Sequence, residues 1–202
     1  MRAHASRICA IVLLCAIGLR GGSGAAAQQV WGLPQLMAAL AQVKSATGQF
    51  TERKTMRMLT QPLVASGRLA YVAPSHIEKV TLSPIPERLV MDGDRVTIVS
   101  GSNNETHTFS IADFPQIGGL VEGIRATLAG DLPTLERLYT TRLSGTPAAW
   151  DLQLLPRNSD LAHVVKWIEF RGEGNRIQTI DTEDGDGDRS EMTIVEDGRN
   201  AR

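Results

Sequence analysis

Apolar and polar positions follow a helical period in two parts of the chain. Apolar side chains recur every three or four residues from Leu33 to Val43, which predicts an amphipathic helix from Pro34 to about Ala46. A second segment with this period follows Asp113, which we expect to cap a helix. The apolar face of this second helix comprises Phe114, Ile117, Leu120, Val121, Ile124 and Leu128. The segment 133–138 predicts a further short helical turn.

Three glycines interrupt the second predicted helix: Gly118, Gly119 and Gly123. An interior glycine costs a helix about 1 kcal/mol relative to alanine. A helix weakened in this way suits a mobile lid, and it equally suits a simple packing element.

Elsewhere the period changes to two, which is typical of strands with one polar face. Asp92-Gly93-Asp94 is a compact hairpin signal between two of these segments. Strand patterns occupy residues 50–59, 63–72, 76–82, 87–91, 95–100, 105–111, 139–143, 149–155, 163–171, 176–182 and 190–196. The first six segments succeed one another without helices, which favours an antiparallel meander over a doubly wound nucleotide-binding sheet. No repeat or linker divides the pattern, so we predict one α+β domain.

The first 27 residues have the pattern of a secretory signal. Arg2 and Arg7 precede an apolar run from Ile8 to Leu19, and small residues then lead to Ala27. A basic start, a short apolar stretch and an Ala-x-Ala exit are typical of a cleaved export signal. We predict cleavage after Ala27, which leaves residues 28–202 as the mature domain. The alternative is an uncleaved N-terminal anchor.

Composition narrows the class of protein. Lys and Arg number 21 against 22 for Asp and Glu, and 4% of the residues are aromatic, which disfavours nucleic-acid binding. Cys9 and Cys15 both lie in the signal, so the mature chain lacks cysteine. A lipid-attachment cysteine requires a small residue before it, but Leu14 precedes Cys15. Losing Arg2, Arg7 and Arg20 changes the formal charge from −1 to −4.

Motifs for catalysis and metal binding are weak. His76, His107 and His163 have no partner at ligand spacing, and the sequence contains neither His-Glu-x-x-His nor Gly-x-Ser-x-Gly. We therefore predict no enzyme, no cofactor and no resident metal. Asp184-Gly-Asp-Gly-Asp188 resembles a calcium loop, but Arg189 and Val195 replace the required Gly and Glu. We interpret it as an acidic turn, with a weak calcium site as the alternative.

The strand segments are rich in aliphatic residues and methionine, among them Leu63, Leu69, Met91 and Ile98. An antiparallel sheet that curls toward a barrel can enclose an apolar cavity beneath its helices. The alternative is that these residues fill an ordinary core. Because aromatic residues are scarce, a cavity in this protein should have aliphatic walls with few tryptophans.

A series of short motifs extends across nearly the whole mature chain. They are Gly48-Gln-Phe-Thr-Glu-Arg-Lys54, Pro62-Leu-x-x-Ser-Gly-Arg-Leu-x-Tyr71, Leu89-Val-Met-Asp-Gly93, Leu128-Ala-Gly-Asp131 and Trp150-x-Leu-x-Leu-x-Pro156. In order and spacing the chain resembles the periplasmic outer-membrane lipoprotein carrier family (LolA-like), as a divergent member. Ala73 replaces a basic residue of the type members, and Glu78-Lys79 stands where they usually carry tryptophan.

The resemblance implies an unclosed antiparallel half-barrel of about 10–11 strands, with a helical lid over an apolar cavity. It implies a monomeric periplasmic carrier that takes acylated cargo from an inner-membrane exporter to an outer-membrane acceptor. The expected cavity and lid residues are Phe50, Leu69, Tyr71, Met91, Ile98, Ile117, Leu120, Val121 and Ile124.

Three alternatives to a lipoprotein carrier remain open. One is a related carrier of a glycolipid or another acylated small molecule that a dedicated exporter hands over. The second is a module that senses lipid or lipoprotein for a signalling partner, and the third is an enzyme acting on lipids.

Overall fold

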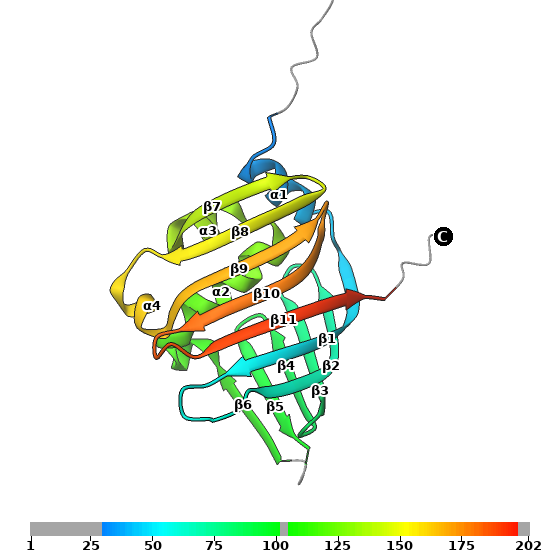
Figure 1. Ribbon diagram of the computed structural model, residues 1–202, viewed down its shortest axis with the longest axis vertical. Helices are drawn as coiled ribbons and strands as arrows, with labels where there is room; N and C mark the ends of the chain where they lie inside the picture. Colours follow the sequence, from blue (N-terminus) through cyan, green and yellow to red (C-terminus); the bar gives the residue numbers. More distant parts are fainter. Residues whose placement is uncertain (1–29, 102–104, 198–202) are drawn as a thin grey trace, which may run out of the picture. The chain divides into compact units, whose positions relative to one another are not determined.

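The computed structural model describes residues 30–101 and 105–197. The expected signal, residues 1–27, and both cysteines lie outside this part of the chain. The strands join in one antiparallel sheet of eleven, in the order β6-β5-β4-β3-β2-β1-β11-β10-β9-β8-β7 (Figure 1). Their bounds are β1 Ser45–Thr55, β2 Leu63–Val72, β3 His76–Ser83, β4 Glu87–Asp92, β5 Arg95–Ser100, β6 Glu105–Ser110, β7 Tyr139–Thr146, β8 Ala149–Pro156, β9 Val165–Glu173, β10 Arg176–Asp184 and β11 Arg189–Glu196.

The sheet is open, because β6 and β7 form its two edges and do not pair with each other. In the middle of the sheet, the last strand of the chain, β11, pairs with the first strand, β1, and Phe50 lies opposite Ile194. The predicted α+β half-barrel is therefore confirmed. Its first and last strands, β1 and β11, are neighbours at the centre of the sheet.

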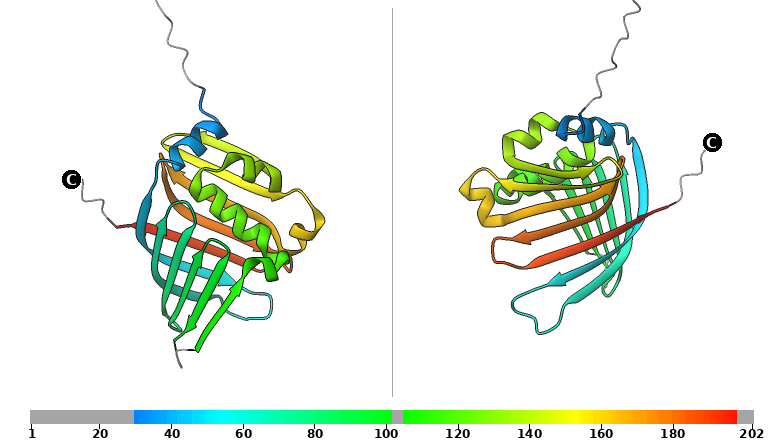
Figure 2. Two further views of the ribbon diagram at one scale, coloured as in Figure 1. Left: turned by 180° about the vertical axis from the view of Figure 1, so that it is seen from behind. Right: turned by 45° about the horizontal axis from the view of Figure 1, so that its top comes forward.

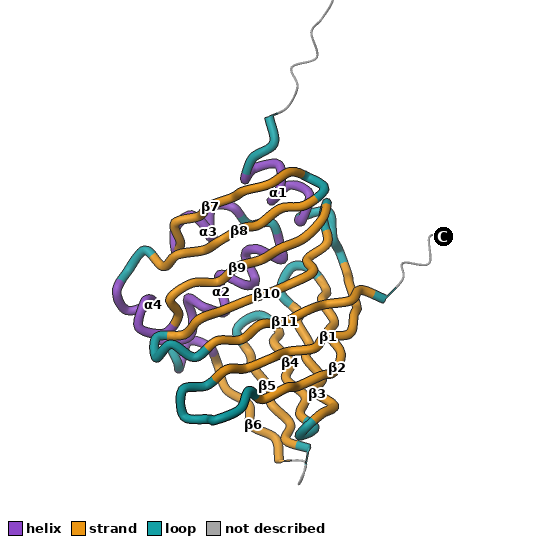
Figure 3. Tube along the Cα trace, in the orientation of Figure 1, coloured by secondary structure: helices purple, strands orange, loops and turns teal. Residues whose placement is uncertain are grey.

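Helical segments connect the strands and cover one face of the sheet. They are α1 Leu33–Leu40, η1 Ile111–Asp113, α2 Pro115–Ala129, α3 Leu132–Leu138 and α4 Ser159–Val164. The rear view in Figure 2 shows α2 crossing the concave face of the sheet, and the trace in Figure 3 shows the helices gathered behind β7–β10. Within the described residues, no helix combines the length and the apolar character needed to cross a membrane.

The densely packed core occupies only the β7–β10 half of the concave face. Its buried members come from α1, α2, α3, α4 and the strands β7–β10, and include Leu36, Leu135, Tyr139, Leu152 and Phe170. Burying a side chain of this size contributes about 1.5–3 kcal/mol. The helices are thus packed against the β7–β10 half of the sheet.

The first helix is shorter than its sequence pattern predicts. It ends at Leu40, a turn closes from Val43 N–H to the Leu40 carbonyl, and β1 begins at Ser45. The predicted extension to Ala46 is wrong because Ser45 and Ala46 pair with Val72 and Tyr71 of β2. Strand pairing therefore overrides the local helical period.

Two other local predictions need correction. Asp113 does not cap α2; it forms a capping box with Ser110 that closes η1, and Phe114 precedes α2 without a side-chain cap. The helix α4 departs from the sequence pattern, which predicts a strand from His163, because Asn158 starts a helical turn that includes His163. Its signal is Asn158, whose side chain accepts a hydrogen bond from the Leu161 N–H at 2.8 Å.

Candidate functional site

A cavity of about 540 Å³ lies between the inner face of the sheet and α2. Its walls come from β1–β4 on one side, β10 and β11 on the other, and α2. The apolar lining comprises Ala46, Met56, Leu69, Ala70, Tyr71, Ile77, Leu89, Met91, Leu120, Ile124, Leu128, Ile177, Ile180, Met192 and Ile194. This volume falls in the range of about 300–1,000 Å³ that is typical of small-molecule sites.

The lining is aliphatic, as the low aromatic content predicts. Tyr71 is the one aromatic side chain among the lining residues of the described part of the chain. Its hydroxyl is buried and has no hydrogen-bond partner within the described residues. Burial also raises the pKa of Tyr71, so the hydroxyl stays protonated and can donate to a ligand atom.

Five of the residues expected from the sequence line this cavity: Leu69, Tyr71, Met91, Leu120 and Ile124. Leu69 and Tyr71 are two residues apart on β2, so their side chains lie on the same, inner face of the sheet. Leu120, Ile124 and Leu128 follow one another at intervals of four, which forms one stripe of α2 facing the sheet.

The other four expected residues are not among those that line it. Phe50 is 2% exposed, and the Lys79 ammonium lies over its ring, 4.9 Å from the ring centroid. Ile98 is opposite Leu89 but one strand further from the cavity. Ile117 and Val121 lie on α2 and are half-buried.

Phe50 also explains a required glycine. A Cβ at Gly67, directly opposite Phe50 on β2, would lie 2.9 Å from the Phe50 ring and 1.9 Å from the Val80 carbonyl oxygen. A side chain at position 67 would therefore collide with the Phe50 ring and with the backbone of β3.

Sequence reasoning missed the wall from β10 and β11, which contributes Ile177, Ile180, Met192 and Ile194. The alternation that places Met192 and Ile194 inward is visible in the sequence 189–196. What the sequence does not show is that β11 pairs with β1, more than a hundred residues earlier.

A charged cluster, also missed, lies within this otherwise apolar lining. Glu52 is 5% exposed, and its Oε2 accepts a hydrogen bond of 2.5 Å from Lys79 Nζ. Its Oε1 accepts one of 2.6 Å from Ser190 Oγ and lies 3.5 Å from Lys54 Nζ. Burial alone would raise the pKa of Glu52, but the hydrogen bonds from Lys79 and Ser190 and the charges of both lysines outweigh it and lower the pKa.

The helix α2 also fits closely against α4 and β7, through a second stripe beside the one that lines the cavity. A Cβ at Gly119 would lie 2.7 Å from Leu161 of α4, and one at Gly123 would lie 2.5 Å from the ring of Tyr139. The Tyr139 hydroxyl donates to the Gly119 carbonyl at 2.9 Å, and burial raises the pKa of Tyr139. Two of the three glycines in this helix therefore permit close packing.

A second connection ties α2 to the hairpin between β4 and β5. The Arg125 guanidinium donates to the Gly93 carbonyl at 2.8 Å and forms ion pairs with Glu122 and Asp94. Because Gly93 has φ of +57°, its backbone adopts the left-handed turn conformation that favours glycine. Arg125 therefore couples the position of α2 to the sheet half that forms the cavity.

The acidic segment from Asp184 to Asp188 is a turn between β10 and β11. Asp184 Oδ1 accepts from the N–H groups of Asp186 and Asp188, and Asp188 accepts from the Arg57 N–H at 2.8 Å. Among residues 30–101 and 105–197, no three His, Cys, Asp or Glu side chains converge in a way that could hold a metal ion. The acidic turn is confirmed.

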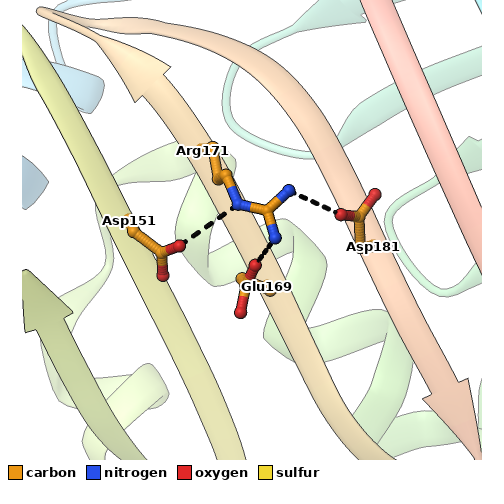
Figure 4. A network of polar contacts seen from close by, with 4 residues as sticks. All are labelled: Asp151, Glu169, Arg171 and Asp181. Atoms are coloured by element: carbon orange, nitrogen blue, oxygen red, sulfur yellow. Dashed lines mark hydrogen bonds and ion pairs between the residues drawn. The ribbon is translucent and has the colours of Figure 1, made fainter.

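The outer face of the sheet carries a separate polar network, centred on Arg171 of β9 (Figure 4). Its guanidinium contacts Asp151 at 3.2 Å, Asp181 at 2.9 Å, and Glu169. These residues lie on three adjacent strands, so the network joins β8, β9 and β10 across the face that points away from the cavity.

Comparisons with known proteins give one family match. A family model described as outer membrane lipoprotein carrier protein LolA-like matches residues 25–201. No curated protein matches the chain.

Several solved structures are similar at low identity. A LolA superfamily protein from Nitrosomonas europaea has a TM-score of 0.45 and 10% identity, over 86% of this chain and 96% of that one. A DUF1329 family protein from Desulfovibrio piger has a TM-score of 0.44 and 8% identity, over 84% and 92%. The MucA/MucB complex of Pseudomonas aeruginosa contains a chain with a TM-score of 0.44 and 15% identity, over 84% and 57%.

The family match covers nearly the whole sequence, and the chain has the open sheet, helical cover and apolar cavity that the resemblance implies. The chain therefore belongs to the LolA-like family of outer membrane lipoprotein carrier proteins.

Proposed function

We propose that this protein is a periplasmic carrier that binds the acyl chains of lipidated cargo in its cavity. In this proposal it acts as a monomer, receives cargo from an inner-membrane exporter and delivers it to an outer-membrane acceptor. The observation that carries the proposal is the cavity of about 540 Å³ with aliphatic walls beneath α2.

Exposing an acyl chain to water has a high free-energy cost, which a carrier avoids. Each methylene group moved from an apolar environment into water costs about 0.8 kcal/mol, so an acyl chain does not cross an aqueous compartment unaided at a useful rate. An aliphatic cavity removes this cost without specific polar contacts along the chain. Methionine side chains such as Met91 and Met192 add adaptable surface for an irregular guest.

Carriage requires binding and release but no covalent step, so we propose a non-enzymatic role. The charged cluster around Glu52 favours, as a second candidate, a carrier of an acylated small molecule with a polar group at one end of its chain. A glycolipid or a similar product of a dedicated exporter belongs to this class.

Two adjacent residues of β11 allow a matched test of the cavity. Ile194 lines it, whereas Val195 points to the other face and is 66% exposed. Ile194→Phe should fill part of the cavity and lower the amount of acyl-bearing molecule bound, and Val195→Phe should leave it unchanged. Organic extraction of the purified proteins followed by mass spectrometry measures the bound molecule per chain.

The wild type should contain close to one acyl-bearing molecule per chain after mild purification. Preparations that are repeatedly empty, together with no binding of an added fluorescent fatty acid, would overturn the proposal. An equal loss in both variants would show that the effect comes from the sheet as a whole and would count against the cavity.

A further inference from the structure

A charged cluster lies in the cavity wall, although an acyl chain alone needs no charged groups for binding. The cluster comprises Glu52, Lys54, Lys79 and Ser190. Desolvating a buried ion pair often costs as much as the attraction recovers, so such a pair is weak evidence for a stabilising role. Glu52 and Lys79 nevertheless lie on adjacent parts of the inner sheet face, with side chains 5–6% and 23% exposed, respectively. Because both residues line the cavity, their charged groups can contact a bound ligand.

The cluster carries an excess of positive charge. One carboxylate, Glu52, is shared by two ammonium groups, those of Lys79 at 2.5 Å and Lys54 at 3.5 Å. Ser190 adds a neutral hydroxyl on the other oxygen. The sum of formal charges in the cluster is therefore +1.

The positive excess is confined to this cluster, because the other charged lining residues are Asp184, Asp188, Arg189 and Glu196. Asp184 accepts from the Asp188 N–H within the hairpin turn, Asp188 accepts from the Arg57 N–H that follows β1, and Arg189 pairs with Glu183 at 2.8 Å. Glu196 lies at the opposite end of β11, across from Gly48, at a distance of about 20 Å along the strand from Ser190.

The lysines also keep unused donors. Within the described residues Lys79 Nζ makes one hydrogen bond, to Glu52, so two of its three N–H groups are available. The Lys54 side chain is 43% exposed and extends from the same face of β1 as Glu52. Donors of this kind bind phosphate and carboxylate oxygens through charge-assisted hydrogen bonds.

We propose that this cluster binds an anionic head group, a phosphate or carboxylate, at one end of a cargo molecule whose chain occupies the aliphatic part of the cavity. The proposal rests on the proposed carrier function and specifies its cargo class as an acidic amphiphile. Lys79 and Lys54 would hold the oxyanion, and the Glu52 carboxylate, which also accepts from Ser190, would compete with it for the two ammonium groups.

Three probes separate the contributions of chain and charge: decyl phosphate, 1-decanol and inorganic phosphate. Isothermal titration of the purified wild type should show decyl phosphate binding roughly tenfold more tightly than 1-decanol. Inorganic phosphate alone should bind far more weakly than decyl phosphate, because it lacks the chain.

Variants of the cluster should change the ratio of the two amphiphile affinities in opposite directions. Lys79→Met and Lys54→Met should each lower the ratio of decyl phosphate affinity to 1-decanol affinity toward one, and Glu52→Gln should raise this ratio. Lys166→Met is the matched control, because Lys166 is an exposed lysine outside the cavity lining.

Each result bears on one of the two proposals. Equal binding of both amphiphiles by the wild type, or a ratio that survives both lysine substitutions, would overturn the head-group proposal and leave carriage intact. Inorganic phosphate that binds as tightly as decyl phosphate would indicate a free-anion site and would also overturn it. If neither amphiphile binds, carriage and head-group binding both fail.

Discussion

Glu52 and Asp181 are two buried carboxylates whose surroundings act on them in opposite directions. Both have less than a tenth of their surface exposed. At Glu52, two lysines and a serine hydroxyl outweigh burial and lower the pKa. At Asp181, burial and the neighbouring charge of Glu191 raise the pKa against the opposing effect of Arg171. The two side chains should therefore respond oppositely to neutralisation.

Glu52→Gln should lower the free energy of unfolding at pH 7 by about 1–3 kcal/mol, because it removes charge-assisted hydrogen bonds. A carboxyl with a lowered folded-state pKa contributes stability above its ordinary value of 4.5 and loses it as the pH falls through the folded-state pKa. Urea unfolding at pH 7 and at about pH 3 should therefore show the gap between the variant and the wild type shrinking. A gap that stays constant would contradict this account. Glu136→Gln, at an exposed position of α3, is the control.

Asp181→Asn should leave the free energy of unfolding at pH 7 unchanged or raise it by up to about 1 kcal/mol. The amide avoids the burial cost of the charge, and Arg171 retains Asp151 and Glu169 as partners. Because the folded-state pKa is raised, the wild type should gain stability relative to the variant as the pH falls toward 3.8. Chemical denaturation across this range measures the difference, and a loss above about 1 kcal/mol at pH 7 would show that the charged form is required.

At the scale of elements, the glycines of α2 have different roles although the sequence presents them alike. Gly119 and Gly123 face Leu161 and Tyr139 at distances that exclude a Cβ, whereas a Cβ at Gly118 would lie 3.6 Å from Ile111, an ordinary contact. The helix therefore packs against α4 and β7 through two of its glycines, and its stripe of Leu120, Ile124 and Leu128 lines the cavity.

This difference predicts opposite effects of the same substitution. Gly123→Ala should lower the free energy of unfolding by about 1–3 kcal/mol, because the fully buried Tyr139 ring cannot move away. Gly118→Ala should raise it by about 0.4–1 kcal/mol by reducing the conformational freedom of the unfolded chain. Thermal and urea unfolding of the two variants test the pair, and equal effects would contradict the packing role of Gly123.

At the scale of the whole molecule, the proposed carrier and the alternative sensing module differ in what their loss does to cargo. Deleting the gene should leave acylated cargo in the inner membrane if the protein is a carrier. Fractionation of the two membranes followed by lipid and lipoprotein analysis measures this distribution. An unchanged distribution combined with an altered transcriptional response would favour the sensing module. Complementation by Val195→Phe but not by Ile194→Phe would connect the defect to the cavity.

Much of the architecture could be predicted from local sequence. The alternation in eleven segments and the helical period of residues 114–128 specify strands and a helix because a residue's direction from the backbone repeats every two or 3.6 residues. The same alternation placed Leu69, Tyr71 and Met91 on the inner face, and the low aromatic content predicted aliphatic walls. The family resemblance assembled these elements into an open half-barrel.

Tertiary structure alone decided where the cavity and its charges lie. Periodicity says which face a side chain is on, but it does not say which strand lies opposite, and the β1–β11 pairing brings Ser190 to Glu52 from 138 residues away. The tertiary structure also shows that the Lys79 ammonium lies over the ring of Phe50, which faces inward. Sequence therefore determined the elements and their faces, because these depend on neighbouring residues. Contacts between distant segments determined the site, because they depend on how the sheet closes on itself.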